Sequence, residues 1–238
     1  MAIDTRQSDN FCNRLLFKQQ FNPRKDIYVS FQTPELPRLI TEDSQFLILT
    51  EDGFALIVDT FTSVTFFVAT TADNGAAFFD PSKGNPGIGT GLLSLSSTGK
   101  ENVSGHIMST CLDFYGGYGL KNQFLSAGDK GVTELQPNSV TVRLSTTGSA
   151  YEHLSTQTID DFDVLNTDFK SFRISFKEHL NRVNLDIKRS EEENFSPAFT
   201  ASNTFPQSGL PDLVYIGIAS SGNEAFTLKD ITYSGDIS

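Results

Sequence analysis

Ser171-Phe172-Arg173-Ile174-Ser175-Phe176-Lys177 is the stretch with the clearest structural pattern in this 238-residue chain. Apolar and polar residues alternate along it, which places every second side chain on one face of an extended strand. The alternation resumes in residues 183–188, Val-Asn-Leu-Asp-Ile-Lys, after the five residues 178–182. The two segments predict an antiparallel β-hairpin with one buried face.

Strand-like patterns recur on both sides of this hairpin. Apolar, β-branched and aromatic residues predict strands over residues 46–50, 54–58, 63–69, 91–96, 105–114, 139–145, 214–219 and 226–233. The runs between 46 and 69 are almost continuously apolar, so we expect them at the centre of a sheet. Residues 151–168 are acidic and predict a loop, and residues 220–223 predict a turn. The sequence shows no convincing helix and no repeat, so the expected fold class is an all-β, two-sheet antiparallel sandwich.

The first 45 residues are the least regular part of the chain. Short apolar runs at 15–17 and 27–31 are separated by Pro23, Pro34 and Pro37, which favour turns and sheet edges. We therefore expect residues 1–45 to form an N-terminal arm or edge strands, and residues 46–238 to form the sandwich. No linker divides the chain, so a single domain is expected overall.

Charge and the N-terminal sequence exclude several classes of partner. The formal net charge of −11 opposes binding to nucleic acid or to an anionic membrane. Residues 1–10 lack the apolar core of a signal peptide, and the most apolar window, 54–70, contains Asp59 and alternates, which excludes membrane insertion. We expect cytosolic synthesis, followed by incorporation into a virion or by release from the cell without a classical signal peptide.

The chain has two cysteines, Cys12 and Cys111. Their spacing leaves a disulfide open, and we favour two buried free thiols. No cluster of metal-ligand residues surrounds either one in the sequence.

Two loops are candidate binding surfaces. Residues 70–90 contain Asp73-Asn74-Gly75 and Gly87-Ile88-Gly89, and residues 115–119 read Tyr-Gly-Gly-Tyr-Gly. Loops of about twenty residues inside a compact domain are usually functional. A plain turn at Asp73-Asn74-Gly75 is the alternative, because Asn and Gly tolerate positive φ.

Three segments in this order resemble the concanavalin A-like lectin and glucanase superfamily, which includes the legume-type lectins. They are residues 64–73 with 87–95, the hairpin 172–176 with 183–187, and residues 213–222 with 231–234. The resemblance implies a jelly-roll β-sandwich that binds a glycan or polysaccharide. It implies that a loop aspartate accepts hydrogen bonds from sugar hydroxyls, that a glycine offers its N–H, and that aromatic rings pack on the sugar. The expected carbohydrate-binding residues are Asp73, Asn74, Gly87, Gly89, Tyr115 and Tyr118.

The metal site of the legume-type lectins has no full counterpart in this sequence. Those proteins place a glutamate and an aspartate two residues apart before the metal loop, and Cys111 and Asp113 occupy the two positions here. The asparagine expected four residues later is Gly117. Because Ca²⁺ takes six to eight oxygen ligands, we expect no metal and no cofactor, with calcium as the alternative.

Catalytic motifs are also missing from the sequence. It contains no alternating pair of glycosidase carboxylates, since Glu191-Glu192-Glu193 is consecutive, and its three histidines fall in no recognisable motif. We therefore expect a non-enzymatic, lectin-like protein that recognises cell-surface glycan, with a glycoside hydrolase that uses another arrangement of catalytic residues as the less favoured interpretation. The alternative is a structural or host-attachment protein of a phage or virus particle, working as a homo-oligomer or with other virion proteins.

Overall fold

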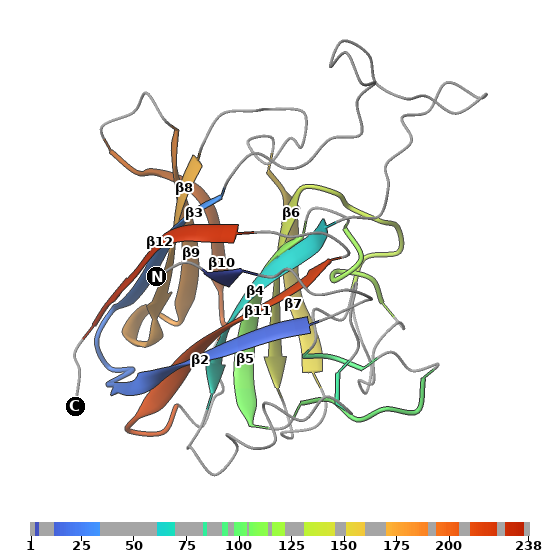
Figure 1. The fold of residues 1–238 in the computed structure, drawn as a ribbon, viewed down its shortest axis with the longest axis horizontal. Coiled ribbons are helices and arrows are strands. Elements are labelled where there is room, and N and C mark those ends of the chain that lie inside the picture. The colour runs from blue at the N-terminus through green and yellow to red at the C-terminus, as the bar shows by residue number, and fades with distance from the viewer. Residues whose placement is uncertain are drawn as a thin grey trace.

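Two antiparallel β-sheets face each other in the computed structural model of the chain (Figure 1). The structure describes residues 3–4, 12–33, 61–69, 83–84, 92–94, 98–103, 105–113, 116–121, 131–145, 151–159, 170–189, 194–204, 210–222 and 227–235. Among these residues, no helix is long and apolar enough to cross a membrane. The predicted all-β sandwich is confirmed.

One sheet is built around the predicted hairpin, and we call it the hairpin sheet. Its strand order is β1 (Ile3–Asp4), β12 (Thr227–Ser234), β3 (Ile27–Thr33), β8 (Lys170–Lys177), β9 (Arg182–Arg189) and β10 (Ser196–Ser202). The short 3₁₀ helix Glu178–Leu180 makes the turn between β8 and β9. In this hairpin Phe172 pairs with Ile187 and Phe176 with Val183, so the predicted antiparallel pair is confirmed and its apolar side chains share one face.

The second sheet carries several loops on its outer face, and we call it the loop-covered sheet. Its strand order is β2 (Cys12–Phe21), β11 (Val214–Gly222), β4 (Phe61–Ala69), β5 (His106–Asp113), β6 (Ser139–Ser145) and β7 (Tyr151–Thr158). In Figure 1 it lies to the right of the hairpin sheet. Strand β4, predicted at the centre of a sheet, lies between β11 and β5 with Ser63–Ala69 buried.

The main core fills the space between the two sheets. Phe31 of β3 stacks on Phe66 of β4 with ring centroids 4.7 Å apart, and on Phe172 of β8 at 5.3 Å. Such ring pairs stabilise a core beyond the apolar area that they bury. The inward side chains predicted for the hairpin are all buried in this core: Phe172, Ile174, Phe176, Val183, Leu185 and Ile187.

Residues 12–33, within the region expected to form an arm or edge strands, form two strands. Strand β2 lies at the edge of the loop-covered sheet, and β3 lies between β12 and β8 inside the hairpin sheet. Residues 12–33 therefore contribute to both sheets, with Pro23 in the turn that joins them. A proline at a turn interrupts the sequence pattern without removing a hydrogen bond from either sheet.

Other expectations need correction. Residues 151–158, expected as a loop, form the edge strand β7, and residues 220–222 continue β11 instead of turning. Residues 92–94 form a turn, not a strand. Strand β10 has no clear signal in the sequence, because Pro197 and a β-bulge interrupt its alternation. The predicted strands 46–50 and 54–58 lie outside the described residues.

Candidate functional site

The outer face of the loop-covered sheet carries a second hydrophobic cluster. Its buried members come from strands β4, β5, β7 and β11 and from the loops lying over them: Phe67, Ala69, Leu92, Leu93, Val103, Cys111, Tyr118, Tyr151 and Ala219. The Val103 N–H donates to the carbonyl of Leu92, and the Tyr151 hydroxyl donates to the carbonyl of Val103 at 3.0 Å. These loop residues are thus fixed to the outer face of the sheet.

Side-chain and main-chain bonds join residues 83–84, 94 and 101–102 to one another. The Gly84 N–H donates to the carbonyl of Glu101 at 2.9 Å, and Lys83 Nζ lies 3.0 Å from Glu101 Oε2. Asn102 Oδ1 accepts from the Ser94 N–H at 2.6 Å. These contacts anchor chain segments on both sides of residues 85–91, where Gly87 and Gly89 stand in the sequence.

Asp113, the last residue of β5, organises the glycine-rich loop that follows. Its Oδ1 accepts from the Gly116 N–H at 2.7 Å, and its Oδ2 accepts from the Tyr118 N–H at 2.6 Å. The carboxylate is buried, and burying it without such donors would be strongly unfavourable. Hydrogen bonds to a charged acceptor are also stronger than neutral ones, so they fix the path of the loop.

Arg143 of β6 holds the same loop from its carbonyl side. Its side chain is fully buried, Nε donates to the carbonyl of Tyr118 at 2.9 Å, and Nη2 donates to the carbonyl of Leu120 at 3.0 Å. The guanidinium also lies 5.6 Å from the centroid of the Tyr118 ring, within range of a cation–π contact. A β-bulge in the β6–β7 ladder falls between Val142 and Arg143, and bulges commonly re-aim a neighbouring side chain.

Glycines let two loop segments pack backbone against backbone. The Lys121 N–H donates to the carbonyl of Val132, and the Val132 N–H donates to the carbonyl of Gly119, both at 2.9 Å. A Cβ on Gly131 would lie 2.4 Å from the carbonyl oxygen of Gly119. A Cβ on Gly116 would meet the carbonyl carbon of Gln136 at 2.3 Å. The glycines of this loop therefore serve close packing within the protein.

The predicted sugar-binding residues have different outcomes. Tyr118 is fully buried, and its hydroxyl shares a 2.8 Å hydrogen bond with Ser109 Oγ, so its ring has no face open to a sugar. The expectation for Tyr118 is therefore wrong, because the loop turns this side chain onto the sheet. The other predicted residues lie outside the described part of the chain, where their roles stay predictions: Asp73, Asn74, Gly87, Gly89 and Tyr115.

The residues at the position of the lectin metal site do not suit a calcium ion. Within the described ranges, no three His, Cys, Asp or Glu side chains converge on a possible metal position. Cys111 is a free, buried thiol, as expected. Burial, with the charge of Asp113 as a second cause, raises its pKa well above the usual range, which keeps it protonated and a poor ligand. Both oxygens of Asp113 already accept main-chain hydrogen bonds.

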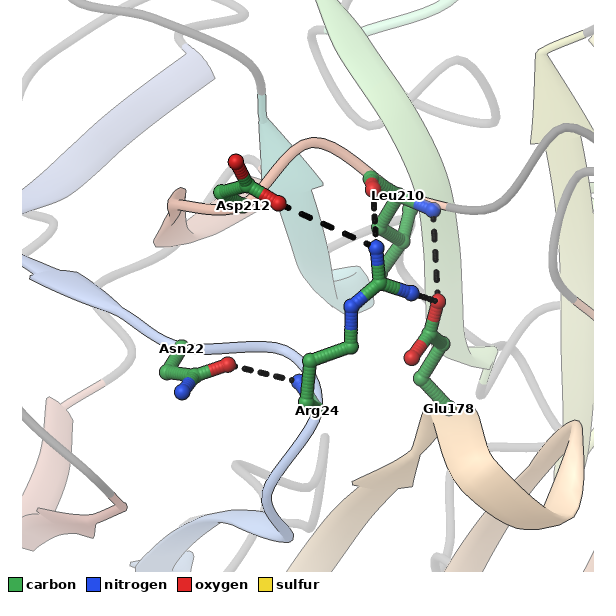
Figure 2. Close-up of polar contacts among 5 residues, drawn as sticks. All are labelled: Asn22, Arg24, Glu178, Leu210 and Asp212. Carbon is green, nitrogen blue, oxygen red and sulfur yellow. Dashed lines mark hydrogen bonds and ion pairs between the residues drawn. The ribbon is translucent and has the colours of Figure 1, made fainter.

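A polar cluster at the turn of the hairpin is a structural clamp (Figure 2). Arg24 Nη1 lies 2.5 Å from Glu178 Oε1, and Arg24 Nη2 donates to the carbonyl of Leu210 at 3.4 Å and lies 3.9 Å from Asp212 Oδ1. The Leu210 N–H in turn donates to Glu178 Oε1 at 3.4 Å. The contacts tie together the β2–β3 turn, the β8–β9 turn and the segment before β11.

Solved structures of plant lectins share this arrangement over almost the whole chain. Lectin II from Ulex europaeus aligns with a TM-score of 0.57 at 13% identity, covering 98% of this chain and 85% of that one. The metal-free form of Griffonia simplicifolia lectin I-B4 gives 0.54 at 13% identity, covering 98% and 92%. Basic winged bean lectin with Tn-antigen gives 0.56 at 10% identity, covering 99% and 87%.

At the level of sequence alone, no protein-family model and no curated protein matches the chain. The likeness is therefore one of architecture: two antiparallel six-stranded sheets packed as a jelly roll. The chain has the concanavalin A-like fold of the legume lectins.

Proposed function

We propose that this protein is a non-catalytic carbohydrate-binding protein that recognises glycan through loops on the outer face of the loop-covered sheet. The observation that carries the proposal is the lectin fold over 98–99% of the chain. Related structures with this fold contain galactose, GalNAc or the Tn-antigen. Since a fold alone does not fix a function, the loops must supply further support.

The described loop ends support a binding surface at this place. Ala69 stands four residues before Asp73, Leu92 stands three residues after Gly89, and both belong to the second hydrophobic cluster. Tyr118, three residues after Tyr115, belongs to the same cluster. The described residues next to the predicted sugar ligands therefore all pack in one buried cluster, and loops on a rigid scaffold commonly carry binding residues.

The engaged carboxylates support a non-catalytic role. Asp113 accepts from main-chain N–H groups, Glu178 from Arg24, and Asp186 from Arg173 at 2.8 Å and 3.0 Å. A glycosidase places two carboxylates on either side of the scissile bond. Each of these three carboxylates instead has a separate structural partner.

A glycan array followed by titration tests the proposal. We expect saturable binding of the wild-type protein to one class of sugar, and at least about tenfold weaker binding by Asp73→Ala, because a charged acceptor is lost. Asp212→Ala is the matched control, since the side chain of Asp212 is 99% exposed. Unchanged binding by Asp73→Ala would remove that residue from the site.

Absence of binding to every glycan would overturn the proposed function. The role in a phage or virus particle, which also stays a prediction, would then be favoured. A defined homo-oligomer in a solution mass measurement would support it.

A further inference from the structure

Two buried charges of opposite sign, on strands β5 and β6, bind the loop 116–121. Arg143 is fully buried, Asp113 is 1% exposed, and both bind the main chain of the loop. Asp113 accepts from the N–H of Tyr118 and Arg143 donates to its carbonyl, so the carboxylate and the guanidinium meet at one loop residue.

The two side chains divide the polar groups of the loop between them. Asp113 accepts from the N–H groups of Gly116 and Tyr118, while Arg143 donates to the carbonyls of Tyr118 and Leu120. A guanidinium is a fixed positive charge with donors in a planar fork, so it can gather carbonyl oxygens as a cation does. Burying these main-chain groups without hydrogen-bond partners would be unfavourable. In this loop the two charged side chains are their partners.

We propose that Arg143 replaces a bound cation in this molecule, and that Asp113 and Arg143 hold the loop 116–121 on the sheet without calcium. This goes beyond the proposed function, because it concerns how the loop is held and stands whether or not the protein binds a sugar. It assigns to Arg143 and Asp113 the role of positioning residues.

The same geometry opposes a cation at this position. Ca²⁺ takes six to eight oxygen ligands at about 2.3–2.6 Å, whereas the described residues bring no group of three or more ligating side chains together, and the carbonyls of Tyr118 and Leu120 face the guanidinium. A metal ion beside the guanidinium would also be repelled by it in a site with little solvent screening. Cys111 stands where the legume-type lectins supply a second carboxylate.

Thermal unfolding of the wild-type protein tests the proposal without any mutation. The protein is stripped with a chelator and then melted with the chelator, with calcium or with manganese. We expect the same Tm in all three, because no ion binds the folded state. An ion that filled a site at a hundred times its Kd would raise Tm by about 5–10 °C, and such a saturable rise would overturn the proposal.

Hydrogen exchange tests the role of Arg143 directly. The amides of Lys121 and Val132 are hydrogen-bonded between the two loop segments and report on the order of the loop. In Arg143→Met we expect these amides to exchange at least about tenfold faster than in the wild type. Arg182→Met, at an exposed position of β9, is the matched control and should leave both amides unchanged.

Unchanged protection in Arg143→Met would overturn the proposal, since the loop would then be ordered without the guanidinium. If Arg143→Met does not fold, the metal titration of the wild-type protein decides alone.

Discussion

Gly116→Ala tests the close packing of the glycine-rich loop. Gly116 has φ +89°, and a Cβ there would lie 2.3 Å from the carbonyl carbon and 2.5 Å from the nitrogen of Gln136. Favourable contacts between carbon atoms are about 3.5–4.0 Å long, so one backbone segment must move by more than about 1 Å. Such a movement breaks the 2.7 Å hydrogen bond from the Gly116 N–H to Asp113.

The expected loss of stability combines two effects. Left-handed backbone with a side chain costs about 1–2 kcal/mol, and the lost hydrogen bond to a charged acceptor costs about 1.5–3 kcal/mol. We therefore expect Gly116→Ala to lower the free energy of unfolding by about 2.5–5 kcal/mol, which in a chain of this size lowers Tm by about 5–20 °C.

Gly99→Ala is the matched control for the backbone effect. Gly99 has φ +67°, but no heavy atom lies within 4 Å of the position of its Cβ. We expect a loss of only about 1–2 kcal/mol in urea unfolding monitored by circular dichroism. Equal losses in the two variants, within about 0.5 kcal/mol, would refute the packing of Gly116 against Gln136.

Three further experiments test other contacts. Gly217→Ala would put a Cβ 2.0 Å from Cζ of the buried Phe67, so we expect the free energy of unfolding to fall by about 1–3 kcal/mol. Adding Phe67→Leu should recover part of this loss, and simple additivity of the two substitutions would contradict the contact. Glu178→Gln weakens the ion pair with Arg24, whose side chain is 52% exposed, so we expect the free energy of unfolding to fall by about 0.5–1 kcal/mol. This loss should be smaller in high salt, and a loss that does not depend on salt would argue against the ion pair. Burial raises the pKa of the Cys111 thiol, so at a pH above the ordinary thiol pKa only the unfolded chain loses this proton, and the free energy of unfolding should fall as the pH rises. Alkylation of Cys111, mapped by mass spectrometry, should occur only as the protein unfolds, and rapid alkylation of the folded protein would contradict the burial.

The hairpin was predictable because its alternation has one cause. Phe172 and Ile174 face the other sheet while Arg173 and Lys177 do not, so burial on one face determines the whole pattern. Strand β7 was not predictable in the same way. It is an edge strand of mostly half-buried polar residues, and an edge strand needs little apolar alternation.

The positions of Tyr118 and Arg143 depend on contacts that the local pattern does not contain. Alternation in residues 139–145 places Arg143 on the outer face of its strand, which in a two-layer sandwich is usually solvated. Here loops far away in the chain cover that face and bury both side chains. A tyrosine among glycines likewise predicts an exposed loop, whereas the glycines allow the loop to lie close to its neighbours.

The most direct test is a crystal structure from crystals soaked with manganese, with anomalous scattering data. It shows whether the loop 116–121 is held on the sheet without a metal ion. We predict two sheets in the order given above, Arg143 within hydrogen-bonding distance of the carbonyls of Tyr118 and Leu120, and no anomalous peak beside Asp113. A manganese ion bound to the Asp113 carboxylate, with the Arg143 side chain turned away from the loop, would contradict the account.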